Sequence, residues 1–139
     1  MSFEDDLKAE SEVVKPTRDV DVSLNGNLHT IRFTQMDGTD WAAATDQAPA
    51  RPGVLLDMRY GYNLRQLVYV VAPKSGKRVV GAEEVALTED QWRLLLKSLK
   101  GGPMMRLGDA LFILNEYEPD EEVAAAKKAS AVAPALNSD

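Results

Sequence analysis

The stretch LKSLKGGPMMRLGDALFILNE, residues 96–116, carries the pattern that decides the fold. Its two apolar segments flank Gly101-Gly102-Pro103. Glycine suits the end of a helix, where a positive φ is needed, and proline suits the first turn of the next one. We therefore interpret the stretch as a helical hairpin broken at the glycines. Apolar residues recur at helical spacing along its second half: Met104, Leu107, Leu111 and Leu114.

The helix before the glycines is also marked at its beginning. Thr88 and Gln91 have the spacing of a capping box, in which each side chain bonds the backbone N–H of the other residue. Leu87 and Trp92 occupy the two positions of a hydrophobic staple. Trp92 also begins an apolar stripe at i, i+3, i+4 and i+7, so we expect it to be a structural anchor together with Thr88.

The segment DVDVSLNGNLHTIRFT, residues 19–34, alternates apolar and polar residues and predicts a β-hairpin. Asn25-Gly26 at its centre favours a two-residue turn, because both residue types accept a positive φ. That turn pairs Val22 with His29 on an apolar face and Asp19 with Arg32 on a solvent-facing side. Since an isolated hairpin is marginally stable, it must pack on other elements.

Those other elements are predicted to be helical. Residues 39–47 contain Trp41 as a second anchor, and residues 60–73 have helical spacing up to Pro73. Residues 50–54 and 74–85 are expected to be connections, the second one exposed. The fold class is therefore α+β, mainly α, with an N-terminal β-hairpin packed on a small bundle of about four helices.

Composition predicts one domain with acidic tails. The 139-residue chain has a net charge of −6, most of it near its ends. We expect a flexible acidic arm over 1–17, a globular domain over 18–119 and a mobile Ala-rich tail over 120–139. A near-neutral body between two acidic tails is a poor match for a phosphate backbone, so we expect no nucleic-acid partner.

Chemistry for catalysis is missing from the sequence. The chain has no cysteine and one histidine, so we expect no metal site, no cofactor and no enzymatic activity. The adjacent acids Glu89-Asp90 fit the positive end of a helix dipole better than a catalytic pair. The helix after Pro103 is apolar and lacks the basic side chains of a DNA-recognition helix. No apolar run approaches the ~20 residues that a membrane span requires, so no membrane partner is expected either.

Several landmarks follow one another in a recognisable order. After the Asn-Gly hairpin and the Trp41 helix come RPGVLLDMRYGYNL, APKSGKRVVG, ALTEDQWRLLLKSL and ALFILNEYEP. This order, over residues 18–119, resembles the tail assembly chaperones of long-tailed (siphovirus) actinobacteriophages. The resemblance implies a non-enzymatic protein of the host cytoplasm that acts in virion morphogenesis and is absent from the finished particle. It would bind the tape measure protein and help to recruit subunits of the major tail tube protein.

The resemblance also implies a longer form of the protein, made by ribosomal frameshifting near the end of the gene. Lys127-Lys128 is a candidate position, because two lysine codons can form an adenine-rich slippery run. The Ala-rich tail would then be a linker between two domains, and the longer form is a possible further partner.

A chaperone for apolar helices needs an adaptable apolar surface, and methionine side chains suit one. Our candidate partner-binding residues are Met104, Met105, Leu107, Leu111 and Phe112. For Met104 a place in the core explains the pattern at least as well, and Met105 is the better candidate for exposure. Two other functions remain open: a structural virion protein, such as a head–tail connector or tail terminator, and a small DNA-binding regulator, which the charge distribution disfavours.

Overall fold

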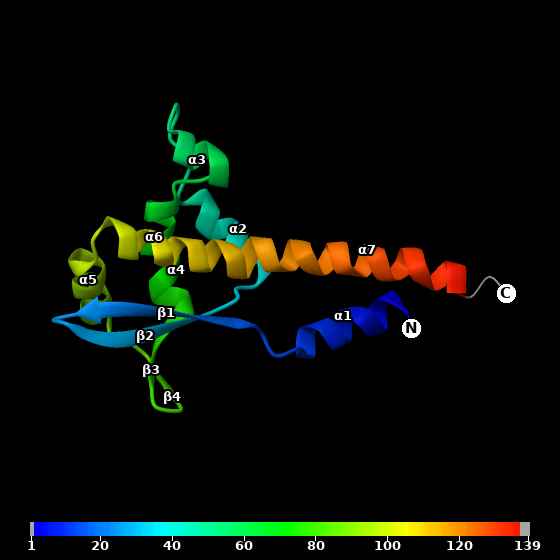
Figure 1. The fold of residues 1–139 in the computed structure, drawn as a ribbon, viewed down its shortest axis with the longest axis horizontal. Coiled ribbons are helices and arrows are strands. Elements are labelled where there is room, and N and C mark those ends of the chain that lie inside the picture. Colours follow the sequence, from blue (N-terminus) through cyan, green and yellow to red (C-terminus); the bar gives the residue numbers. More distant parts are fainter. Residues whose placement is uncertain (1, 137–139) are drawn as a thin grey trace.

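The computed structural model describes residues 2–136 and has an α+β architecture (Figure 1). A four-stranded antiparallel sheet of order β1-β2-β3-β4 lies against the helices. The fold class is as predicted, but the helices outnumber the about four expected, and the sheet extends beyond the hairpin. In chain order the elements are α1 Phe3–Glu12, β1 Thr17–Leu24, β2 Asn27–Thr34, α2 Gly38–Asp46, α3 Leu55–Tyr60, α4 Leu64–Ser75, β3 Gly76–Val80, β4 Glu83–Val85, α5 Glu89–Ser98, α6 Gly101–Phe112, the π-helical turn η1 Ile113–Tyr117 and α7 Glu118–Leu136.

The predicted hairpin and its register are confirmed. Asn25 and Gly26 have φ of 52° and 77°, the positive values that the two-residue turn requires. Val22 pairs with His29, and Asp19 pairs with Arg32. The Arg32 guanidinium lies 2.7 Å from Asp19 Oδ1, and this contact holds the pKa of the Asp19 carboxyl below its usual range.

The expectation that residues 74–85 form only an exposed connection is wrong. Its residues form the end of α4 and two further strands, of which β3 pairs with β2 and β4 pairs with β3. Gly81 has φ of 60° and allows the tight turn between them. The sequence KRVV was too short to indicate a strand alone. It becomes one because the free edge of β2 offers hydrogen-bond partners.

Helix α4 forms the centre of the core, with Leu64, Leu67, Val68 and Val71 fully or almost fully buried. The helical prediction for this segment is confirmed, but its limits are shifted. Asn63 caps the first turn through Gln66 N–H, and the helix continues through Pro73 to Ser75. A proline near the end of a helix removes one hydrogen bond without ending the packing of the segment, and Ser75 Oγ donates to Thr34 O at 2.7 Å.

Helices α5 and α6 confirm the helical hairpin but not the way it turns. The Thr88–Gln91 capping box is present, with donor–acceptor distances of 3.1 and 2.8 Å, and Trp92 is buried. Gly101 and Gly102, however, are the first residues of α6 and do not have positive φ. The chain turns at Leu99 and Lys100, whose backbones are extended, so a left-handed cap is not needed.

Helix α6 continues through η1 into α7, past the domain boundary expected at residue 119. Pro119 is tolerated because the π-helical turn precedes it: the carbonyl of Leu114, which lacks an N–H from Pro119, accepts from Gln35 Nε2 at 2.9 Å. The segments expected to be a flexible arm and a mobile tail contain α1 and most of α7. Both helices lead away from the body on the same side (Figure 1). No residue of α1 is buried, and residues 120–131 of α7 are exposed.

Candidate functional site: an apolar groove between the hairpin and α5

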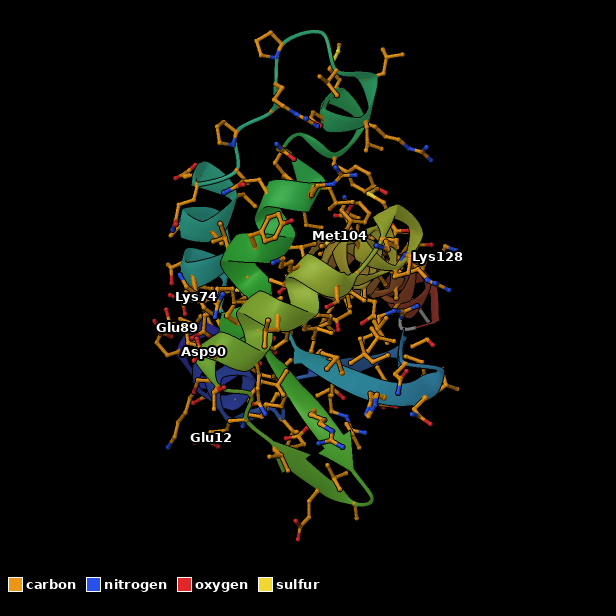
Figure 2. The ribbon with its side chains drawn as sticks, turned by 90° about the vertical axis from the view of Figure 1, so that its left-hand side faces the viewer. Glu12, Lys74, Glu89, Asp90, Met104 and Lys128 are labelled. Carbon is orange, nitrogen blue, oxygen red and sulfur yellow. The ribbon has the colours of Figure 1, made fainter. Side chains whose placement is uncertain are left out.

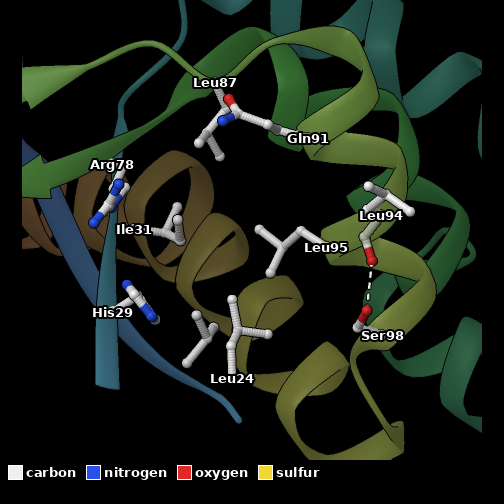
Figure 3. A pocket seen from close by; sticks show the side chains of 10 residues that line it. Leu24, His29, Ile31, Arg78, Leu87, Gln91, Leu94, Leu95 and Ser98 are labelled. Carbon is white, nitrogen blue, oxygen red and sulfur yellow. Dashed lines mark hydrogen bonds between the residues drawn. The ribbon is translucent and has the colours of Figure 1, made fainter. Parts of the chain in front are cut away.

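An open groove of about 410 Å³ lies between the concave face of the hairpin and α5 (Figure 3). We call it the hairpin–α5 groove. Apolar side chains dominate its walls, and its few polar residues lie among them. The lining residues are Val22, Leu24, His29, Ile31, Arg78, Leu87, Gln91, Leu94, Leu95 and Ser98.

The two walls follow from the local sequence patterns. The alternation in β1 and β2 turns Val22, Leu24 and Ile31 toward the helices, so they form the floor. The capping box fixes where α5 begins and therefore which of its residues face the sheet. Leu95 faces the floor and is buried, whereas Leu94 is 55% exposed at the margin.

The polar residues of the groove include one charged side chain. Among the described residues that line the groove this is Arg78 from β3, and no carboxylate is among them; His29 from β2 is a further polar residue. Gln91 lies at the mouth, while the Ser98 hydroxyl is occupied by its bond to Leu94 O at 2.7 Å. The groove therefore combines an apolar floor with a cationic edge, which suits an apolar segment that carries acidic residues.

Most of the candidate partner-binding residues lie elsewhere. Met104, Leu107 and Leu111 are buried, and α6 packs them against α4, so their side chains are not available at the surface of this fold. This corrects the assignment of a partner surface to the α6 stripe. Met105 and Phe112 are partly buried and pack on the same core.

Phe112 belongs to an aromatic cluster that joins α2, α3, the loop between α3 and α4, and α6. Its ring meets Tyr60 edge-on at 5.1 Å between centroids, and Tyr62 meets Trp41 edge-on at 6.0 Å. The hydroxyl of Tyr60 donates to Asp109 Oδ1 at 2.6 Å, and the buried hydroxyl of Tyr62 donates to Glu116. Burial and the Glu116 carboxylate raise the pKa of Tyr62, so both hydroxyls stay protonated donors. Trp41 is thus an anchor, as predicted, within a structural cluster.

A second exposed apolar feature lies on α3, far from the groove. Leu55, Leu56 and Met58 point to solvent, with 81%, 39% and 66% of their surfaces exposed, and we call them the α3 knob. The loop that presents them is held by Asp57, whose carboxylate accepts from Arg51 Nε at 2.9 Å and from Arg51 N at 2.8 Å. The knob is therefore a fixed protrusion, and the connection expected over residues 50–54 lies just before it.

One local sequence pattern, which the sequence analysis did not include, indicates an exposed apolar residue at the groove. Residues 94–96 are three consecutive leucines, and one helix face cannot bury all three. Leu95 and Leu96 take the buried positions, and Leu94 remains at the groove. The contribution of β3 to the groove, through Arg78, required the tertiary structure.

The adjacent acids at the beginning of α5 are solvated. Glu89 and Asp90 lie exposed at the beginning of α5 (Figure 2), and Asp90 pairs with Arg93 at 3.2 Å. Within residues 2–136, no group of three or more potential ligand side chains could hold a metal ion. The same range contains no helix with the length and apolarity of a membrane span.

Comparisons with known proteins give no assignment. The chain matches no family model, no curated protein and no solved structure.

Proposed function

We propose that this protein is a phage tail assembly chaperone that binds an apolar helical segment of the tape measure protein in the hairpin–α5 groove. The observation that carries the proposal is the groove itself: an open apolar surface between two rigid walls, with Leu94 exposed at its margin. Such a groove accepts one face of an amphipathic helix through anchors spaced at i, i+3 and i+4. The tape measure protein is proposed as the partner because the landmark order over 18–119 resembles that of tail assembly chaperones.

A tape measure protein exposes long apolar helical faces until the tail tube surrounds it. A groove with few polar contacts can bind many such segments with modest affinity, because the contacts depend on shape and apolarity more than on a hydrogen-bond pattern. Bound chaperone would hold the tape measure protein extended while major tail tube subunits assemble on it. The chaperone is then released, and the finished particle lacks it.

The binding test uses the product of the long helical reading frame that we expect next to this gene. The wild-type chain and the variant Leu94→Asp are each co-expressed with that product and recovered by affinity purification. Leu94→Asp puts a charge on the apolar margin and should abolish recovery of the partner. Leu55→Asp is the matched control, because it changes an even more exposed leucine outside the groove. Equal recovery with both variants would exclude the groove as the binding site.

Proteomics of purified virions separates the chaperone from its main alternative. A chaperone in the host cytoplasm leaves the particle, whereas a head–tail connector or tail terminator stays in it. Detection of this chain at ring stoichiometry in virions would favour the structural alternative.

The proposed longer form has its own test. Lys127 and Lys128 are exposed on α7, which projects from the body and could lead into an appended domain. The gene should contain an overlapping −1 reading frame behind a slippery heptamer. Mass spectrometry of infected cells should detect a minor, longer product that shares the first residues with this chain.

A further inference from the structure

Helix α1 is an amphipathic element without a partner. It has a complete capping box at Ser2 and Asp5, yet none of its ten residues is buried. Phe3 and Leu7, one helical turn apart, are 72% and 54% exposed. A helix shorter than about 12–15 residues is marginal in water without packing. Its apolar face therefore needs a surface to cover it.

Helix α1 leads away from the chain's own groove in this structure (Figure 1). The Lys15–Asp37 ion pair and the bond from Gln35 N–H to Pro16 O, 3.0 Å long, fix the chain where it enters β1. The groove residue Ile31 is level with Val20 and lies about 17 Å from Lys15 along the strand. A helical α1 carries Leu7 roughly 17 Å from Lys15, so Leu7 would reach Ile31 only if the chain reversed its direction at Val13 and Val14. Figure 1 shows α1 at the end of β1 opposite α5. A groove on another molecule has no such restriction.

Charge distinguishes α1 from the other exposed apolar element of the chain. Helix α1 contains five carboxylates and one lysine, and three of the carboxylates lie in its first turn. The described residues that line the groove include the cation Arg78 and no carboxylate. The α3 knob instead carries Arg59 beside Met58, so binding of the knob would bring Arg59 close to Arg78 of the groove. Opposite charge thus favours α1 and like charge disfavours the knob.

We propose that the groove of one molecule binds α1 of a second copy, with Phe3 and Leu7 on the apolar floor and the acidic residues toward Arg78. When the α1 helix of each copy binds in the groove of the other copy, the two molecules form a closed, two-fold symmetric dimer. This inference concerns self-association and does not depend on the tape measure protein as a partner.

The absence of cysteine permits a direct test, because every thiol introduced is unique. Full-length chains carrying Leu7→Cys are mixed with chains carrying Leu94→Cys and oxidised. We expect a disulfide-linked pair of the two different chains. Chains with Leu55→Cys, an exposed control outside the groove, should not cross-link to Leu7→Cys. Equal cross-linking to both positions would overturn the proposal. So would an intramolecular disulfide in a chain that carries both Leu7→Cys and Leu94→Cys, when it forms in place of the intermolecular one.

Sedimentation velocity tests the association without cross-links. The wild-type chain should form a dimer that dissociates on dilution. Leu7→Asp and Leu94→Asp should each raise the dimer Kd at least about tenfold, since each puts a carboxylate on an anchor position. Leu55→Asp should leave the Kd unchanged. Circular dichroism confirms that the variants are folded. A monomeric wild-type chain, or a dimer insensitive to Leu7→Asp, would contradict the model of exchanged α1 helices. Leu7→Asp lies outside the groove, so its effect is separate from any loss of tape measure binding.

Discussion

Single buried residues fix the positions of whole elements in this protein. Trp92 closes the space between α5, α4 and the sheet, and its indole reaches the backbone where β3 begins. A Cβ placed on Gly76 would lie 2.8 Å from Trp92 Cη2, closer than two carbon atoms can pack. Gly76 and Trp92 therefore depend on each other for their packing, although fifteen residues of chain lie between them.

We expect Trp92→Ala to lower the free energy of unfolding by about 3–5 kcal/mol, because it empties a large buried volume and removes the staple partner of Leu87. Met105→Ala, at a partly buried position on α6, should cost less than Trp92→Ala. Urea unfolding followed by circular dichroism measures both. Equal losses would show that Trp92 is not the anchor of this region.

The buried Asp57 carboxylate predicts a dependence of stability on acid. Hydrogen bonds from the Arg51 side chain, and then from its backbone N–H, lower the pKa of Asp57 in the folded state. A lowered folded pKa means that the contribution to stability is complete above the unfolded value of about 3.9 and is lost as pH falls below it. Asp57→Asn should therefore be less stable than wild type at neutral pH.

The measurement is the free energy of unfolding of both chains between pH 2 and pH 6. The difference between wild type and Asp57→Asn should shrink as pH falls through about 4. Asp90→Asn serves as the control, since Asp90 is exposed and its pair with Arg93 lies on the surface. A constant difference at every pH would mean that the Arg51–Asp57 pair does not stabilise the α3 loop through its charge.

At the scale of elements, the contact between α4 and α6 depends on a missing side chain. A Cβ on Gly108 would lie 2.7 Å from Leu64 Cγ, so the two helices approach at this point as closely as they can. Gly102, in the first turn of α6, has no atom within 4 Å of its Cβ position.

Gly108→Ala should therefore destabilise the fold by about 1–3 kcal/mol through overpacking. Gly102→Ala, the matched control on the same helix, should be neutral or stabilise by up to about 1 kcal/mol. Thermal melts of the two variants, each compared with wild type, show whether each substitution raises or lowers the stability of the fold. Stabilisation by Gly108→Ala would show that α6 can shift away from α4 without loss.

The terminal helices contribute little to the core. Neither α1 nor residues 120–131 buries a side chain, so a chain trimmed to residues 13–119 should melt as cooperatively as the full chain. This range keeps the Lys15–Asp37 and Arg18–Glu118 pairs. Thermal melting of both chains, followed by circular dichroism, measures this cooperativity. The protein concentration should be low enough that self-association does not add to the stability of the full chain. A broad, non-cooperative melt would place one of the tails in the core.

At the scale of the whole molecule, one groove has two proposed occupants. Helix α1 of a second copy and the tape measure segment would contact the same floor and compete. Deleting residues 2–12 should therefore increase the affinity for the partner severalfold at protein concentrations where the dimer predominates. Titration of a labelled partner fragment with each chain measures this. The variant Leu7→Asp is the control that keeps the helix and removes one anchor, and it should have a similar effect. Weaker binding by both would show that α1 assists the partner instead of competing with it.

The sequence by itself determined the elements whose signals are local. The Asn25-Gly26 turn fixed the hairpin register, the Thr88–Gln91 box fixed the beginning of α5, and Trp92 marked the core, because each depends on residues close together in the chain. The tertiary structure alone decided what depends on distant partners. Residues 76–80 became a strand because the edge of β2 was free, and Pro119 stayed within a helix because a π-helical turn precedes it. The apolar stripe of α6 indicated a surface or a core equally well, since spacing reports which residues share a face and not what covers that face. Packing against α4 buried the stripe, and the groove remained where α5 and the hairpin meet without closing over Leu94.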